Sequence, residues 1–179
     1  MDEIIKHLKR GEVVALPTDT VYGLAAPFAA VDKLFALKGR SPHQPILILA
    51  ATLDQIEPYL ENPPQSFYWL ARDYWPGPLS LVVPVKGDLP QACQQEGSAG
   101  FRIPNHPLAL EVLAEVGPLA VTSANRSGEP PAKKAEEVHF DVPILAGGAA
   151  SGEPSTILKW EGARWELIRM GKVVPLLPQ

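Results

Sequence analysis

The stretch LPTDTVYGL, residues 16–24, joins an apolar run to a cluster of polar side chains. The run Val13–Leu16 is predicted to form a short buried strand, and Pro17 ends it because proline removes a backbone donor from the ladder. Two hydroxyls, a carboxylate and a phenol follow before Gly23. Polar side chains at the end of a buried strand are where α/β proteins place ligand sites, but Thr and Asp are also ordinary turn residues. The stretch alone therefore fits either a ligand site or a capped turn.

Composition limits the classes of protein to which the chain can belong. Its 179 residues, 46% hydrophobic and 20% charged, predict one globular domain that spans residues 1–179. No apolar run approaches the ~20 residues of a membrane span, so no membrane contact is expected. The single cysteine, Cys93, and an acidic N-terminus without a signal-peptide layout favour the cytoplasm. A net charge of −4 without a Lys/Arg cluster argues against nucleic acid held by bulk electrostatics.

Strand patterns alternate with helix patterns along the chain, which predicts an α/β fold with a mixed sheet. Helical spacing is found at 2–10, 31–38, 66–74 and 107–116. Strands are expected at 13–16, 46–49, 79–85, 101–104, 119–121, 144–146, 155–158 and 165–169. Residues 87–100 are expected to be a long mobile loop. Ser66 and Asn105 are expected to cap the third and fourth helices.

Four short polar segments share one predicted layout, in which hydroxyls or amides accompany a buried strand. They are residues 18–22, 98–102, 122–125 and 155–156. Without a carboxylate pair nearby, such groups suggest binding and positioning rather than acid–base chemistry. Four cations at loops or element ends would suit a polyphosphate if they converged: Lys38, Arg40, Arg102 and Arg169. The sequence has no P-loop, no G-x-G-x-x-G and no G-x-S-x-G, and its histidines lack metal spacing.

Six motifs occur together in a recognisable order: PTDTVYGL at 17–24, KGR at 38–40, WPGPL at 75–79, RIPNHP at 102–107, TSANRSG at 122–128 and PSTI at 154–157. In this order, over about residues 3–175, the chain resembles the YrdC/Sua5 family of threonylcarbamoyl-AMP synthases. The resemblance implies a twisted mixed sheet flanked by helices, with a deep, positively charged cleft. It also implies that L-threonine, bicarbonate and ATP, with Mg²⁺, give threonylcarbamoyl-AMP and pyrophosphate. Partner proteins would then use the product to modify a tRNA adenosine beside the anticodon.

The resemblance also assigns roles to individual residues. It implies threonine contacts from Thr20, Arg102, Ser123 and Ser155. It implies nucleotide and phosphate contacts from Lys38, Arg40, Gln44, Ser98, Asn125, Lys133 and Arg169. Lys38 and Arg40 would be the catalytic cations, because charge builds on phosphate oxygens as pyrophosphate leaves. No nucleophile of the protein and no metal held by the protein is implied.

The sequence departs from the family pattern at Ser41, Leu49 and Lys159, where proline, histidine and an acidic residue are frequent. These departures leave open a paralogue with the same fold and another substrate. A second alternative is an RNA-binding or ribosome-associated module that uses the same cleft for tRNA or double-stranded RNA.

Overall fold

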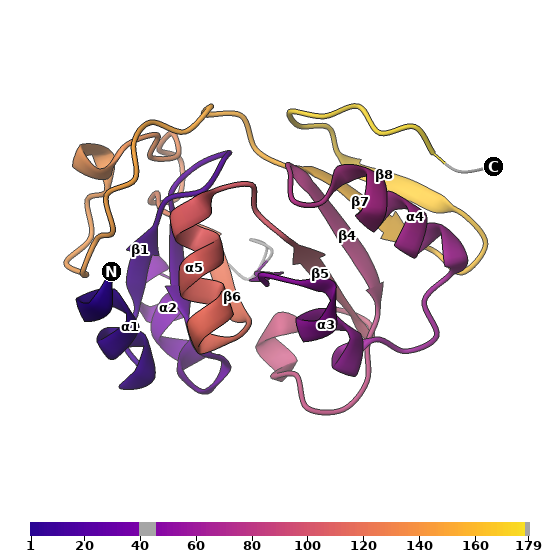
Figure 1. Ribbon diagram of the computed structural model, residues 1–179, viewed down its shortest axis with the longest axis horizontal. Coiled ribbons are helices and arrows are strands. Elements are labelled where there is room, and N and C mark those ends of the chain that lie inside the picture. Colours follow the sequence, from indigo (N-terminus) through magenta and orange to yellow (C-terminus); the bar gives the residue numbers. More distant parts are fainter. Residues whose placement is uncertain (40–45, 178–179) are drawn as a thin grey trace.

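The computed structural model describes residues 1–39 and 46–177, whose strands form a single eight-stranded sheet (Figure 1). The sheet contains β1 (Val14–Leu16), β2 (Gly23–Ala26), β3 (Leu47–Leu49), β4 (Leu79–Pro84), β5 (Ser98–Arg102), β6 (Leu119–Ser123), β7 (Thr156–Trp160) and β8 (Trp165–Arg169). Their spatial order is β1-β2-β6-β3-β5-β4-β7-β8. The β3–β5 and β4–β7 pairs are parallel and the others antiparallel, so the predicted mixed sheet is confirmed.

Helices cover both faces of this sheet. They are α1 (Asp2–Lys9), α2 (Val31–Lys38), α3 (Leu53–Ile56), α4 (Gln65–Tyr74) and α5 (Pro107–Val116), with short 3₁₀ helices η1 (Phe28–Ala30), η2 (Glu57–Tyr59), η3 (Gln91–Cys93) and η4 (Ala135–Glu137). Apolar residues of α1 and α5 pack on β1, β2 and β6, whereas those of α2 and α4 pack on the opposite face. The two termini lie at opposite ends of the molecule in Figure 1.

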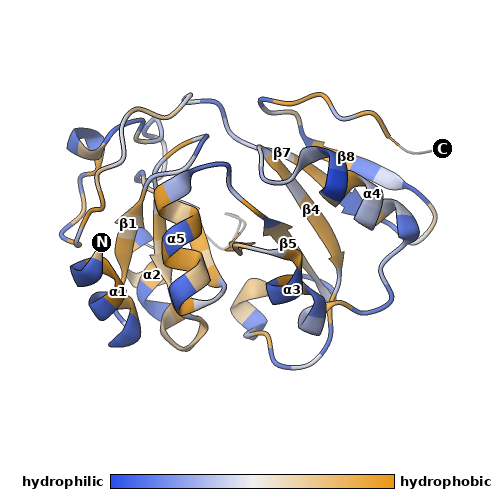
Figure 2. Cartoon of the chain, in the orientation of Figure 1, coloured by the Kyte–Doolittle hydropathy of each residue, from blue (hydrophilic) through white to orange (hydrophobic). Residues whose placement is uncertain are grey.

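Local sequence explains most of these elements. In α1, Ile4 and Leu8 are one turn apart and both buried, while acidic residues begin the helix and basic residues end it. Gly39 ends α2 in the left-handed conformation, with φ +74°. Figure 2 shows hydrophobic residues along β1 and β4 and hydrophilic ones over much of α1 and α3. Among the described residues, no helix combines the length and apolar character that crossing a bilayer requires.

The structure corrects several predicted elements. Strand β2 was not predicted, because Gly-Leu-Ala-Ala has little intrinsic strand preference. Residues 98–100, expected at the end of a loop, belong to strand β5 together with Phe101 and Arg102, and within 87–97 Leu89 and Cys93 are buried. The expected strand at 144–146 is reduced to an isolated bridge between Ile144 and Ala15.

The expected helix caps are also wrong, because neither side chain caps its helix. Pro64 precedes α4 and His106 precedes α5, each in an extended conformation. The Ser66 hydroxyl instead accepts a hydrogen bond of 2.9 Å from the Trp165 indole, which ties α4 to β8.

Tyr22 links the β1–β2 loop to a distant segment of the chain. Its side chain is fully buried. Its hydroxyl accepts a hydrogen bond from the Gly147 amide at 2.9 Å and donates one to the Gly148 carbonyl at 3.3 Å. Because Ala15 also bonds to Pro143 and Leu145, this hydroxyl completes the attachment of the 143–148 segment to the sheet.

We therefore expect Tyr22→Phe to lower the free energy of unfolding by about 1–3 kcal/mol, because it leaves the Gly147 N–H without its partner. Urea denaturation monitored by circular dichroism measures this change. The matched control is Tyr68→Phe, which removes the hydroxyl of a half-buried tyrosine in α4 that bonds to none of the described residues. It should change stability by less than about 0.5 kcal/mol. Equal effects of the two substitutions would contradict the role given to the Tyr22 hydroxyl.

Candidate functional site

The β1–β2 loop is held in shape by Thr18. Its hydroxyl oxygen accepts hydrogen bonds from the amides of Thr20 and Val21, at 3.1 and 3.2 Å, and its own proton goes to the Val21 carbonyl at 2.5 Å. This is the local side-chain turn that threonine favours. Thr20 is buried in this turn, and its hydroxyl oxygen lies 3.1 Å from that of Thr18. The loop thus has a fixed conformation before any ligand binds.

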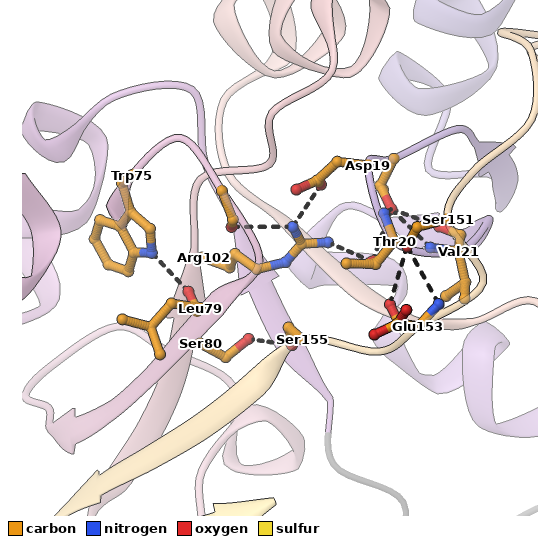
Figure 3. A network of polar contacts seen from close by, with 12 residues as sticks. Asp19, Thr20, Val21, Trp75, Leu79, Ser80, Arg102, Ser151, Glu153 and Ser155 are labelled. Atoms are coloured by element: carbon orange, nitrogen blue, oxygen red, sulfur yellow. Dashed lines mark hydrogen bonds and ion pairs between the residues drawn. The ribbon is translucent and has the colours of Figure 1, made fainter. Parts of the chain in front are cut away.

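Arg102 at the end of β5 is the centre of the polar network in Figure 3. The residue is only 4% exposed, and its Nη1 donates to Asp19 at 2.6 Å and to the Gly77 carbonyl at 3.2 Å. Nη2 donates to the Thr20 hydroxyl at 3.0 Å, whereas Nε has no partner among the described residues. A buried guanidinium needs such partners, because leaving its charge uncompensated would cost several kcal/mol. The network joins β5 to the β1–β2 loop and to the turn after Trp75.

A second guanidinium approaches from β8. Arg169 donates to the Ser155 carbonyl from Nε at 3.0 Å and from Nη2 at 2.9 Å, and Nη2 also reaches the Ser155 hydroxyl at 3.2 Å. That hydroxyl lies 2.8 Å from the Ser80 hydroxyl of β4. Burial lowers the pKa of the Arg169 guanidinium, and the nearby charge of Arg102 lowers it further. The positive charges of Arg102 and Arg169 therefore repel each other, which indicates a local excess of positive charge.

These groups surround a cavity of about 190 Å³, here called the small cavity. It opens on the sheet face that α1 and α5 partly cover. The described residues that line it are Thr18, Thr20, Val21, Gly23, Leu47, Leu49, Arg102, Val121, Thr122, Ser123, Pro131, Pro154, Ser155 and Arg169. All four predicted threonine contacts are among them, together with Arg169 from the predicted nucleotide set. The lining combines hydroxyls and two guanidinium groups with the apolar side chains of Leu47, Leu49 and Val121.

Lys38 and Asn125 meet at the end of β6. The Lys38 ammonium donates to the Ser123 carbonyl at 2.8 Å, to the Asn125 carbonyl, and to the Asn125 side-chain oxygen at 3.4 Å. The Ser123 hydroxyl donates to the same Asn125 side-chain oxygen. Burial lowers the pKa of the Lys38 ammonium to about 8. In this conformation Lys38 holds the 123–125 segment, so contact with a phosphate requires it to exchange at least one of these bonds.

The other predicted nucleotide contacts lie elsewhere. Ser98 lines a second cavity of about 420 Å³, here called the large cavity, which shares Leu47 with the small one. Lys133 is exposed, and its side chain lies against Gly152, where an added Cβ would come within 2.5 Å of its Cε. Arg40 and Gln44 fall outside the described residues.

Sequence reasoning missed Asp19, Gly77 and Ser80 as parts of the site. Asp19 and Gly77 stand inside the motifs quoted above, yet nothing local shows that both bond to Arg102. Ser80 belongs to β4, and its contact with Ser155 depends on the parallel β4–β7 pairing. The motifs therefore pointed to Asp19 and Gly77, but the sequence did not show which residue each of them contacts.

Within the described residues, no three His, Cys, Asp or Glu side chains are grouped to hold a metal ion. Cys93 is buried, and burial raises the pKa of its thiol to about 11, so it is a poor nucleophile.

Comparison with known proteins shows the family to which the chain belongs. A family model for Sua5, YciO and YrdC proteins, described as "Telomere recombination", matches residues 6–171. A threonylcarbamoyl-AMP synthase from Chromohalobacter salexigens is 36% identical over 165 aligned residues, covering 87% of this chain and 89% of the relative. The enzyme of that name from Bacillus subtilis is 38% identical over 156, covering 84% and 45%. The chain belongs to the Sua5/YciO/YrdC family.

A solved structure extends the likeness to three dimensions. The crystal structure of P. abyssi Sua5 complexed with L-threonine matches with a TM-score of 0.88 and 32% identity. The match covers 94% of this chain and 53% of the Sua5 chain. The present chain therefore spans about half the length of that protein and of the B. subtilis relative. The expected mixed sheet flanked by helices is confirmed, and so is the resemblance noted from the sequence, whereas the deep, positively charged cleft stays a prediction.

The low pKa of Lys38 can be tested directly. In an NMR titration of its ε-CH₂ signals we expect a midpoint near pH 8 rather than 10.5, the ordinary lysine value. Since the unfolded chain then binds the proton more tightly, this group should make the free energy of unfolding rise with pH between about 8 and 10.5. Lys38→Arg identifies the signal and should lack this rise. A midpoint close to 10.5 would mean that Lys38 is better solvated than its contacts indicate.

Proposed function

We propose that this chain is a threonylcarbamoyl-AMP synthase. The observation that carries the proposal is the convergence of Thr20, Arg102, Ser123, Ser155 and Arg169 on one cavity, although they come from segments far apart in the sequence. That convergence occurs in a member of a family whose relatives include proteins named threonylcarbamoyl-AMP synthase. The reaction would take L-threonine, bicarbonate and ATP and give threonylcarbamoyl-AMP, pyrophosphate and water.

The small cavity has the size and chemistry for threonine. Its volume of about 190 Å³ lies below the roughly 300–1,000 Å³ of pockets for drug-sized ligands, so it suits a small polar molecule. The Nε–H of Arg102 is buried and has no partner among the described residues, and a substrate carboxylate is the natural acceptor for such a donor. Leu49, where the family often has histidine, is 2% exposed and lines the apolar side, where the threonine methyl would lie.

The large cavity suits the nucleotide. Its lining near Gly100 is apolar, because the side chains of Leu47 and Val82 pack beside this glycine, 2.7 and 3.4 Å from where a Cβ would stand. A base would pack against this apolar lining. Because Leu47 lines both cavities, the α-phosphate would then lie near the small cavity. The phosphates would be held by Lys38, Arg40, Gln44, Ser98, Asn125, Lys133 and Arg169, as the family motifs imply.

The chemistry needs positioning rather than a protein nucleophile. The threonine amine first takes up the carbon of bicarbonate, which loses water to give a carbamate. A carbamate oxygen then attacks the α-phosphorus of ATP, and the bond to the β-phosphate breaks to release pyrophosphate. Charge builds on non-bridging oxygens, where fixed cations are most effective. Mg²⁺ would arrive on the ATP phosphates, in keeping with a site of hydroxyls, amides and guanidinium groups that offers no carboxylate cluster.

The product is a reactive mixed anhydride, so it must pass to an acceptor. We propose that partner proteins transfer its threonylcarbamoyl group to the tRNA adenosine beside the anticodon, as the family resemblance implies. A direct contact of this chain with tRNA is compatible with that role, although its net charge of −4 leaves only local patches to provide it.

Pyrophosphate release tests the function. We expect the purified protein to release pyrophosphate from ATP only when threonine and bicarbonate are both present. Release without threonine would favour the paralogue, and RNA binding without ATP binding would favour the RNA-binding module. Ser155→Ala is an informative variant, because it removes the hydroxyl shared by Ser80 and Arg169. It should lower kcat/KM for threonine by about tenfold, the effect of losing one hydrogen bond to a charged group.

The choice of amino acid tests the cavity assignment. Threonine should be preferred to serine by about 1–3 kcal/mol, the worth of one methyl group in an apolar pocket. Valine should be rejected more strongly than serine, because it has no hydroxyl to exchange hydrogen bonds with lining residues such as Thr20 and Ser123. Competition among the three amino acids for adenylate formation measures the order. If valine performed as well as serine, these hydroxyls would not read the substrate hydroxyl, even if the enzyme class survived.

A further inference from the structure

Asp19 forms a buried ion pair with Arg102. Its Oδ1 lies 2.6 Å from Nη1, and the side chains of Arg102 and Asp19 are 5% and 16% exposed. Thr18 and Thr20 on either side of Asp19 line the small cavity, but Asp19 is absent from the described lining. In Figure 3 the carboxylate reaches the guanidinium from the side opposite Ser80 and Ser155. Asp19 thus contacts the arginine without facing the space where a ligand would bind.

The contacts of Arg102 are divided between its edges. Nη1 is occupied by Asp19 and by the Gly77 carbonyl, both fixed parts of the protein. Nη2 has the Thr20 hydroxyl alone, and Nε has no partner among the described residues. The Nε and Nη2 edge is one of the pairs of parallel donors with which arginine binds a carboxylate. Asp19 and Gly77 therefore occupy one end of the guanidinium and leave this edge for another acceptor.

The charges agree with this division. Arg102 and Arg169 bring two positive charges to the cavity, and each guanidinium stays protonated at neutral pH. Asp19 compensates one of them at 2.6 Å, whereas Arg169 has only the neutral oxygens of Ser155 among its hydrogen-bond partners in the described chain. The described groups around the cavity thus carry one uncompensated positive charge, which matches one substrate carboxylate.

We propose that Asp19 is a positioning residue for amino-acid binding: it holds the Arg102 guanidinium so that its free edge faces the substrate carboxylate. The proposal rests on the proposed function and adds a residue to its threonine site. Asp19 touches neither substrate nor reacting atoms, and it acts through Arg102. Its removal should therefore weaken threonine binding while leaving the large cavity, and with it ATP binding, nearly unchanged.

Michaelis constants separate this role from a purely structural one. A variant that merely folds poorly loses active enzyme, which lowers the apparent kcat and leaves both KM values unchanged. Asp19→Asn keeps the size of the side chain and removes its charge, so we expect the KM for threonine to rise at least about tenfold. The KM for ATP should change by less than about threefold. Asp19→Glu keeps the charge one methylene further out and should give an intermediate KM for threonine.

A double-mutant cycle tests whether Asp19 acts through Arg102. Arg102→Lys removes the planar fork that Asp19 orients. In that background, Asp19→Asn should raise the KM for threonine by less than about twofold, because no guanidinium is left to position. Full additivity of the two substitutions would show that Asp19 acts independently and would overturn the proposal.

Asp73→Asn is the matched control, because Asp73 pairs at 3.0 Å with Arg72 in an exposed position, with its side chain 54% exposed. It should leave both KM values and kcat at their wild-type levels. Wild-type KM values in both Asp19 variants, or equal rises for threonine and ATP, would overturn the positioning role while the synthase assignment stood. If the wild-type protein released no pyrophosphate in response to threonine, the proposed function would fail and the proposal with it.

Discussion

The burial of the Arg102 guanidinium is the constraint on which the site depends. A charge that is 4% exposed must be compensated by the surrounding chain, and two separate segments supply the partners. Asp19 and Thr20 come from the β1–β2 loop, and the Gly77 carbonyl comes from the turn between α4 and β4. One buried cation thus fixes the relative positions of a loop, a turn and a strand end. Arg102 and Thr20 of this network also line the small cavity.

Two glycines allow close side-chain packing on the rest of that sheet face. Gly23 on β2 and Gly100 on β5 lie on the face where the two cavities form. An added Cβ at Gly23 would stand 2.6 Å from a Val121 methyl, and one at Gly100 would stand 2.7 Å from a Leu47 methyl. Glycine inside a strand lowers the stability of that strand, and here it lets a side chain of the adjacent strand pack against the backbone. Pairing with two neighbouring strands offsets that loss, because β2 lies between β1 and β6, and β5 lies between β3 and β4.

Features that depend on residues close together in the sequence could be predicted from it. Ile4 and Leu8 placed α1, Gly39 ended α2, and polar segments at strand ends indicated most of the small cavity. Strand β2 escaped prediction because its sequence favours no strand, and its pairing with β1 and β6 supplies the stability. The pair of Asp19 with Arg102 joins residues 83 positions apart, so it depends on the order of the strands in the sheet. Sequence could name both motifs, but only the fold shows that they meet.

Two guanidinium groups beside one cavity oppose folding and favour binding at the same time. Burial and the charge of Arg102 both lower the pKa of Arg169, which means that its charged form is held at an electrostatic cost. Arginine cannot relieve that cost by losing its proton near neutral pH. Asp19 relieves part of it at one end of Arg102, and an anion in the cavity would relieve the remainder. Because such an anion interacts with the folded chain and not with the unfolded one, the energy stored between the arginines becomes affinity for the substrate.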